Sequence, residues 1–212
     1  MKNKNKVRQL VILGLLTAIL LIMAYTPLGY LNIGPLAVTF NVIPVAVAAF
    51  ALGPVGGAII GGMFGLTSFL QCFGGSALGT ALFAVNPALT VIQCFVPRIL
   101  DGLIIGAICN FLKKKGAPSP VSSAVTGFCA AFFNTLLYMS SLILLFGNTE
   151  LIQNYREQLA PGKNVFLFVC AFVGINAVAE MISSTIISGA VGTALAKAKL
   201  VEVPGKKEKA AA

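Results

Sequence analysis

Three ionisable side chains, Arg98, Asp101 and Glu180, lie deep inside apolar stretches of this 212-residue sequence. An ionised group in the hydrocarbon of a membrane costs free energy unless it pairs with another group or lines a polar cavity. Arg98 and Asp101 are three residues apart, so on a helix they share a face and could form an internal ion pair. Alternatively, the Arg98 guanidinium could anchor an anionic substrate, because it binds a carboxylate through two parallel hydrogen bonds.

Uncharged polar side chains accompany these charges at helical spacing. Asn134 and Tyr138 are four residues apart, as are Asn176 and Glu180, so each pair shares one face of a helix. If the first helix runs outward and the second inward, these groups converge in one outward-facing pocket for a small polar molecule. A single Asn in a membrane helix can instead form an ordinary interhelical hydrogen bond. The candidate substrate-binding residues are Asn41, Asn86, Arg98, Asn134, Tyr138, Asn176 and Glu180.

The composition identifies the kind of protein that must position these residues. Apolar residues make up 58% of the chain and charged residues only 10%, whereas a soluble domain has roughly 25% charged residues. This composition excludes a soluble enzyme and a disordered chain, and it indicates a polytopic membrane protein. The chain has no histidine, which removes histidine-based metal sites and triads. No phosphate-binding loop motif occurs, so we expect no nucleotide hydrolysis by this chain. We also expect no metal and no cofactor.

Apolar runs and helix breakers predict an all-α fold with six membrane helices. A basic start followed by an apolar run also describes a signal peptide, but the first run is too long for one. The second segment has about 13 residues, or ~20 Å of helix, so we expect it to be extended by residues 36–41 or to lie tilted. Residues 1–197 form a single membrane domain, and residues 198–212 form a basic, solvated tail. The predicted helices cover residues 7–26, 40–52, 55–73, 88–112, 121–146 and 164–195.

Positive charge is concentrated in three clusters. Twelve of the 15 Lys and Arg residues lie in residues 2–8, in residues 113–115 and in the tail after residue 196. Basic residues in short loops face the cytoplasm, and six spans place all three clusters there. We therefore expect both termini in the cytoplasm. The clusters lie at helix ends without a recognition module, so nucleic-acid binding is not expected.

Small residues at four-residue spacing predict close helix packing. Gly53, Gly57, Gly61 and Gly65 form a stripe that lets another helix approach closely in lipid, most simply within the same protein. The first helix carries a weaker pair, Gly14 and Ala18. Either stripe could instead contact a partner membrane protein.

An ordered set of segments resembles the substrate-binding S component of energy-coupling factor (ECF) transporters, over about residues 7–197. Within that family the Gly-Pro-Leu loop, Asn134 and the Gly-x-Asn-x-x-x-Glu pattern are most similar to pantothenate-type members. The segments are residues 33–44, Leu52-Gly53-Pro54, Leu66-Thr67-Ser68, Asn86-Pro87, Pro97-Arg98-Ile99-Leu100, Asn134-Thr135, and Gly174-Ile175-Asn176 with Glu180.

The resemblance implies a multi-pass subunit in the cell membrane that is not itself an enzyme. Such a subunit captures a vitamin from outside and tips over in the membrane to deliver it inward. It works with a transmembrane coupling subunit and two ATPases. Gly14 and Ala18 occupy the position of a small-residue motif that contacts the coupling subunit in many members. Pantothenate is the favoured substrate, and riboflavin or another vitamin such as pyridoxine stays open.

A different class of function uses the same charges. A self-sufficient secondary transporter, or a small homo-oligomeric channel, could couple ions through Arg98, Asp101 and Glu180. Transporters of that kind usually have repeated halves with broken helices. We find no repeat between residues 1–106 and 107–212, which favours the S component.

Overall fold

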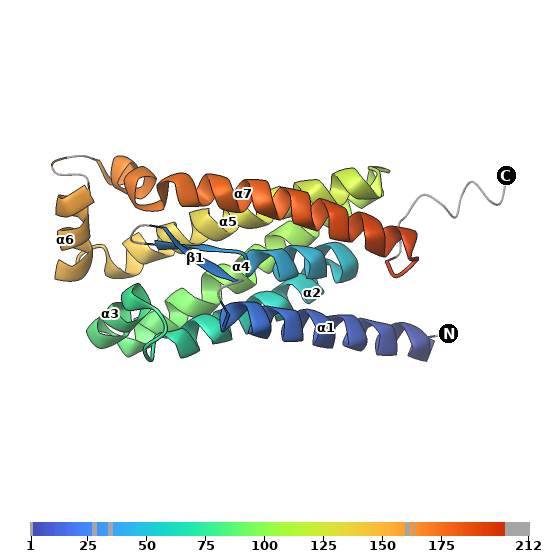
Figure 1. Ribbon diagram of the computed structural model, residues 1–212, viewed down its shortest axis with the longest axis horizontal. Helices are drawn as coiled ribbons and strands as arrows, with labels where there is room; N and C mark the ends of the chain where they lie inside the picture. The colour runs from blue at the N-terminus through green and yellow to red at the C-terminus, as the bar shows by residue number, and fades with distance from the viewer. Residues whose placement is uncertain (1, 27–28, 34–35, 160–161, 163, 202–212) are drawn as a thin grey trace.

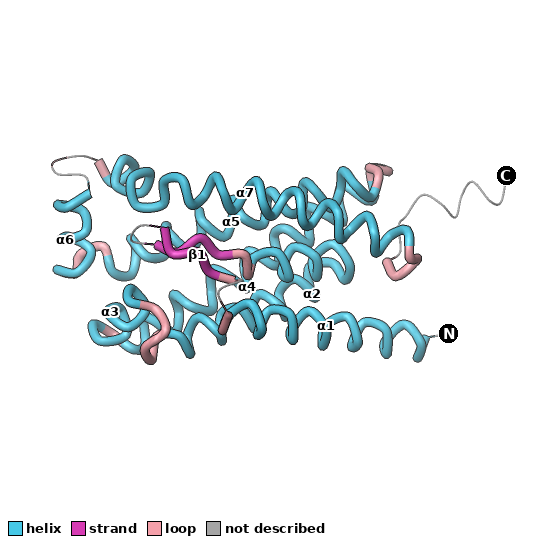
Figure 2. The backbone as a smooth tube through the Cα atoms, in the orientation of Figure 1, coloured by secondary structure: helices cyan, strands magenta, loops and turns pink. Residues whose placement is uncertain are grey.

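The computed structural model describes residues 2–26, 29–33, 36–159, 162 and 164–201. These residues form a mainly helical protein, as the sequence predicts, together with one short pair of strands (Figures 1 and 2). The elements are α1 (Lys2–Ala24), β1 (Tyr30–Ile33), β2 (Leu36–Thr39), α2 (Val42–Gln71), α3 (Ala77–Val85), α4 (Pro87–Lys114), α5 (Ser119–Phe146), α6 (Glu150–Leu159) and α7 (Val165–Lys197).

Five segments in the described part of the chain are long and apolar enough to cross a membrane. Two further helices, α3 and α6, are too short to do so. The chain is therefore a multi-pass membrane protein. The five segments are Lys6–Ala24, Val42–Gln71, Pro87–Lys114, Ser119–Phe146 and Asn176–Lys197.

Helix α2 contains the break that the Gly53-Pro54 pair predicts. Gly53 has φ +75°, a conformation that glycine adopts most readily. A β-carbon on Gly57 would lie 3.1 Å from the Cβ of Ala49, although eight residues of straight helix span ~12 Å. The two halves of α2 therefore fold back on each other, and they correspond to the predicted helices 40–52 and 55–73.

A lysine completes the hydrogen bonding at this break. In a continuous helix the Phe50 carbonyl would accept a hydrogen bond from residue 54, but Pro54 has no N–H group. The buried Lys113 ammonium donates to that carbonyl instead and lies 4.2 Å from the centroid of the Phe50 ring. This contact ties the end of α4 to the turn in α2.

The glycine stripe packs α2 against α4, as predicted for internal packing. A β-carbon on Gly61 would clash with the carbonyl oxygen of Arg98, and one on Gly57 would clash with that of Gly102. Because side chains are absent here, the two backbones touch. The stripe thereby fixes the position of Arg98 relative to α2.

Helices α5 and α7 are joined through small hydroxyl residues. The Ser184 hydroxyl donates to the Gly127 carbonyl at 2.8 Å, and the Ser123 hydroxyl donates to the Gly189 carbonyl at 3.3 Å. A β-carbon on Gly127 would clash with the Ser184 backbone. Helices α5 and α7 therefore pack closely against each other.

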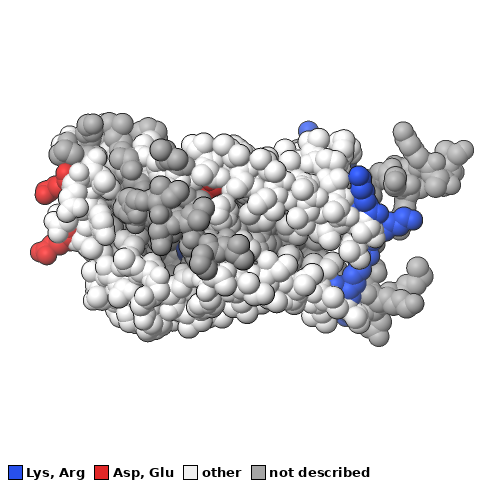
Figure 3. All heavy atoms as spheres, viewed as in Figure 1, with Lys and Arg blue, Asp and Glu red and all other residues white. Residues whose placement is uncertain are grey.

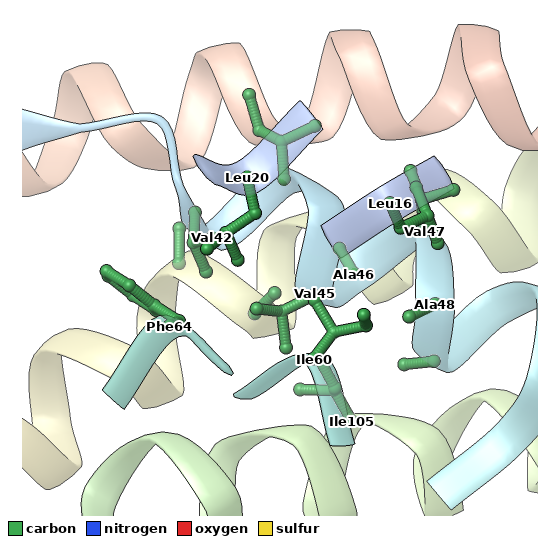
Figure 4. Packing of buried hydrophobic residues seen from close by; sticks show 14 residues of the cluster. Leu16, Leu20, Val42, Val45, Ala46, Val47, Ala48, Ile60, Phe64 and Ile105 are labelled. Atoms are coloured by element: carbon green, nitrogen blue, oxygen red, sulfur yellow. The ribbon is translucent and has the colours of Figure 1, made fainter. Parts of the chain in front are cut away.

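An apolar core lies between α1, both halves of α2, α4 and α5 (Figure 4). Leu20, Val45, Ile60 and Ile105 are almost fully buried in it. Lipid tails are as apolar as these side chains, so the hydrophobic effect does not favour helix association in a membrane. Dispersion contacts and close packing stabilise such a core instead. The core holds the helices around a cavity on one side of it.

Short elements that were not predicted lie between the long helices. Residues 36–41 were expected to extend the second helix unless it lies tilted, but residues 36–39 form strand β2, which pairs antiparallel with β1 from Tyr30↔Thr39 to Ile33↔Leu36. Gly34 and Pro35 of the Gly-Pro-Leu loop lie outside the described residues. The connections between the predicted helices at residues 74–87 and 147–163 contain the short helices α3 and α6.

Charge separates between the two ends of the molecule. Figure 3 shows Lys and Arg gathered at the end where α1 begins and α7 finishes, while acidic side chains mark the opposite end, where α6 lies. The hairpin and α3 lie in the half of the molecule nearer α6 (Figure 2). The cavity described next belongs to that half.

Candidate functional site

A cavity of about 730 Å³ lies between α2, α3, α4, α5 and α7. The end of β2 reaches it through Thr39, and α3 covers it through Leu78 and Leu82. Its volume is typical of a small-molecule site. Five of the seven predicted substrate-binding residues line it, namely Arg98, Asn134, Tyr138, Asn176 and Glu180.

The Arg98 side chain is buried and held between two aromatic rings. Its guanidinium carbon lies 4.7 Å from the ring centroid of Phe64 and 5.0 Å from that of Tyr138. Its Nη1 donates to the carbonyls of Gln93 at 3.2 Å and Cys94 at 3.0 Å. Its Nε has no hydrogen-bond partner in the described structure. The guanidinium is thus positioned by the protein, and not all of its donors have a partner in the described structure.

The internal ion pair suggested by the sequence spacing is not formed. Asp101 is buried but does not line the cavity, and its Oδ1 has no hydrogen-bond partner in the described structure. Among the described residues, no carboxylate forms an ion pair with Arg98. The Arg98 guanidinium therefore has no directly paired carboxylate among the described residues, and an anionic ligand would supply one.

Glu180 connects the hairpin to α7. Its carboxylate is buried, and Oε1 accepts a hydrogen bond of 2.7 Å from the backbone N–H of Thr39. Because Thr39 ends β2, this bond fixes the hairpin at the edge of the cavity. Glu180 thus has a structural partner as well as a place in the cavity wall.

Two amide side chains that line the cavity contain a buried oxygen without a hydrogen-bond partner in the described structure. Gln93 is fully buried and its Nε2 donates to the Tyr138 carbonyl at 2.9 Å, but its Oε1 has no partner in the described structure. The Oδ1 of buried Asn134 likewise has no hydrogen-bond partner in the described structure. Leaving a buried acceptor unpaired costs about 1–3 kcal/mol. A ligand donor that reached either oxygen would remove that cost.

Gln93 was not among the predicted site residues. Its signal in the sequence was an amide in an otherwise apolar helical segment, five residues before Arg98. The cavity has further polar lining that the sequence reasoning missed. These residues are Thr39, Ser68, Gln71, Thr90 and Thr135.

Two predicted residues lie away from the cavity. Asn86 caps α4, since its Oδ1 accepts a hydrogen bond of 3.1 Å from the Leu89 backbone, directly before Pro87 at the first helical position. Asn41 is fully buried at the start of α2. Neither residue is part of the cavity lining.

The predicted docking pair lies on the outer surface of α1. Gly14 and Ala18 are both exposed, and no atom would lie within 4 Å of a β-carbon on Gly14. Exposed apolar side chains flank them, including Val11, Leu15 and Ile22. This face is open to lipid or to another membrane helix.

Comparison with known proteins shows what this sequence is similar to. The family described as "ECF transporter, substrate-specific component" matches residues 8–191. A protein of Leuconostoc mesenteroides named "Pantothenate transporter PanT" is 32% identical over 201 residues, which cover 91% of this chain and 94% of the relative. A second relative, "Pantothenic acid transporter PanT" of Lactococcus lactis subsp. cremoris, is 26% identical over 210 residues, covering 93% and 98%.

Proposed function

The chain belongs to the family of ECF transporter substrate-specific components, and we propose that it binds pantothenate as the membrane subunit of an ECF-type vitamin importer. The observation that carries this proposal is a buried arginine, without a carboxylate partner among the described residues, inside a cavity of about 730 Å³. A site of this kind suits a small organic anion. The names of the two relatives support pantothenate as that anion.

The chemistry of pantothenate complements the cavity. The molecule has one carboxylate, one amide and two hydroxyls. Its carboxylate pairs with Arg98, and its N–H and O–H groups donate to Gln93 and Asn134, whose side-chain oxygens lack other partners in the described structure. Asn176, Glu180 and Tyr138 complete the polar lining. The apolar wall formed by Phe64 and Leu82 accommodates the rest of the molecule.

We assign six passages through the membrane, with both termini in the cytoplasm. The passages are α1, the two halves of α2 on either side of Gly53, α4, α5 and α7. The basic end of the molecule then faces the cytoplasm, in agreement with the positive-inside rule (Figure 3). In this orientation the cavity lies in the outward half of the cell membrane, where it receives substrate from outside.

Transport is assigned to a complex rather than to this chain alone. A transmembrane coupling subunit docks on the α1 face around Gly14 and Ala18, where the small side chains allow close approach. Two separate ATPases hydrolyse ATP. The subunit then tips in the membrane and delivers the vitamin inward.

The experiment that tests this function reconstitutes the chain in liposomes with and without a coupling subunit and its ATPases. We expect uptake of radiolabelled pantothenate only when the full set and ATP are present. Uptake at the same rate from liposomes that contain this chain alone, driven by an ion gradient, would contradict the assignment. That result would support a self-sufficient secondary transporter instead.

A further inference from the structure

A second cavity, of about 400 Å³, lies at the basic end of the molecule. It is lined by the first turns of α1, by the turn of α2 at Gly53, by the last turns of α4 and by Leu200. On α2, Gly53 lines this cavity and Phe64 is the nearest following residue that lines the substrate cavity, so 11 residues of helix, or roughly 16 Å, separate them. The two cavities are therefore distinct sites.

The charged lining of this cavity is entirely basic. It contains Arg8, Lys113 and Lys114, and no acidic residue is among its described lining. Lys113 is already engaged with the Phe50 carbonyl, as described above. Arg8 and Lys114 form no hydrogen bond or ion pair within the described residues. Their two charges remain available for an anion.

The remaining lining combines apolar residues with the two amides Gln9 and Asn110. Ile12 of α1 and Leu52 at the turn of α2 face the cavity together with Leu200. The neighbouring surface of α1 exposes further large apolar side chains, including Leu10 and Val11. A molecule that fits this site carries a negative charge at one end and hydrocarbon at the other. The site also lies where the membrane-spanning helices emerge at their basic ends (Figure 3).

We propose that this cavity binds the phosphate of an anionic phospholipid. Arg8 and Lys114 contact the phosphate, and the acyl chains lie along the apolar face of α1. Basic pockets between membrane helices bind lipid head groups by this combination of charge and burial. A lipid held there would bridge α1 and α4 beside the turn of α2.

The test compares two double variants that remove the same charge. Arg8→Gln/Lys114→Gln alters the cavity, while Lys6→Gln/Lys115→Gln alters exposed basic residues that do not line it. Each protein is reconstituted in nanodiscs containing phosphatidylglycerol and phosphatidylcholine, and bound lipid is counted by native mass spectrometry after extraction. Thermal unfolding and pantothenate binding of both variants are measured alongside as a check on folding.

We expect the wild type and the Lys6/Lys115 variant to retain phosphatidylglycerol in preference to phosphatidylcholine. The Arg8/Lys114 variant should retain it at least about fivefold less, since each basic residue near an anionic lipid contributes about that factor in affinity. Equal losses of phosphatidylglycerol in both variants would show that lipid retention depends on general surface charge, and this result would overturn the proposed site. Full displacement of the lipid by millimolar inorganic phosphate would overturn the assignment to a lipid.

Discussion

Arg98 is the residue on which the proposed chemistry depends most. Phe64 and Tyr138 hold its guanidinium from two sides, and backbone carbonyls fix Nη1. A cation held in this way and shielded from water attracts a carboxylate strongly, because little reorganisation is needed on binding. The flat, forked shape of the group also matches a carboxylate, which can accept two parallel hydrogen bonds from it.

Replacing Arg98 should therefore abolish selectivity for the carboxylate. We expect Arg98→Ala to lower pantothenate affinity by about 30-fold or more, since truncating one partner of a buried charge pair costs about 2–5 kcal/mol. Arg98→Lys should keep part of the affinity, because the charge stays but the fork is lost. Titration calorimetry with pantothenate and with its alcohol analogue, which lacks the carboxylate, measures both effects. An Arg98→Ala variant that still prefers pantothenate to the alcohol would show that the carboxylate binds elsewhere.

The unpaired oxygen of Asn134 leads to a second prediction at this scale. Asn134→Leu removes an acceptor that a ligand donor would satisfy, so we expect pantothenate affinity to fall about tenfold. Asn110→Leu is the matched control, because Asn110 lies at the basic end and not at the substrate cavity. The same calorimetric titration applies. Equal affinities of the two variants would remove Asn134 from the binding site.

At the scale of elements, the structure depends on close approach between helices. Gly57 and Gly61 let α2 touch α4, and that contact sets the height of Arg98 in the bundle. The stripe and the break at Gly53-Pro54 were predictable, because a missing Cβ and a missing N–H act locally. The hairpin was not, since four-residue strands have no distinctive pattern and pair only in three dimensions.

The glycine contact can be tested with neighbouring positions. Gly61→Ala places a methyl group against the Arg98 backbone, whereas a methyl at Gly62 would lie 3.7 Å from the Ile99 side chain, an ordinary contact. We expect Gly61→Ala to lower stability by about 1–3 kcal/mol and to weaken pantothenate binding, while Gly62→Ala changes little. Thermal unfolding in detergent and binding assays decide this. Indistinguishable variants would mean that α2 and α4 can separate without cost.

The hairpin should depend on Glu180. Glu180→Ala removes the acceptor for the Thr39 amide, so that amide should exchange with deuterium faster than in the wild type. Glu180→Gln keeps a carbonyl acceptor and should restore most of the protection. Hydrogen–deuterium exchange with mass spectrometry over residues 36–41 provides the comparison. Unchanged exchange in Glu180→Ala would show that other contacts hold the hairpin.

At the scale of the whole molecule, one end is basic and the other half contains the cavity (Figures 1 and 3). The sequence was sufficient to predict a mainly helical membrane protein and five residues that line one cavity, because helical spacing places residues on faces. The sequence could not show that Asn86 caps a helix rather than lining the cavity. An Asn before a Pro is also the expected start of a helix, and only the packing decides which role applies.

The most direct measurement of the central claim is equilibrium binding of pantothenate to the purified subunit, without ATPases or a coupling subunit. The claim predicts saturable binding of one pantothenate per chain, with little competition from riboflavin or pyridoxine and a large loss in Arg98→Ala. Absence of saturable pantothenate binding by a folded subunit that binds another vitamin would contradict it.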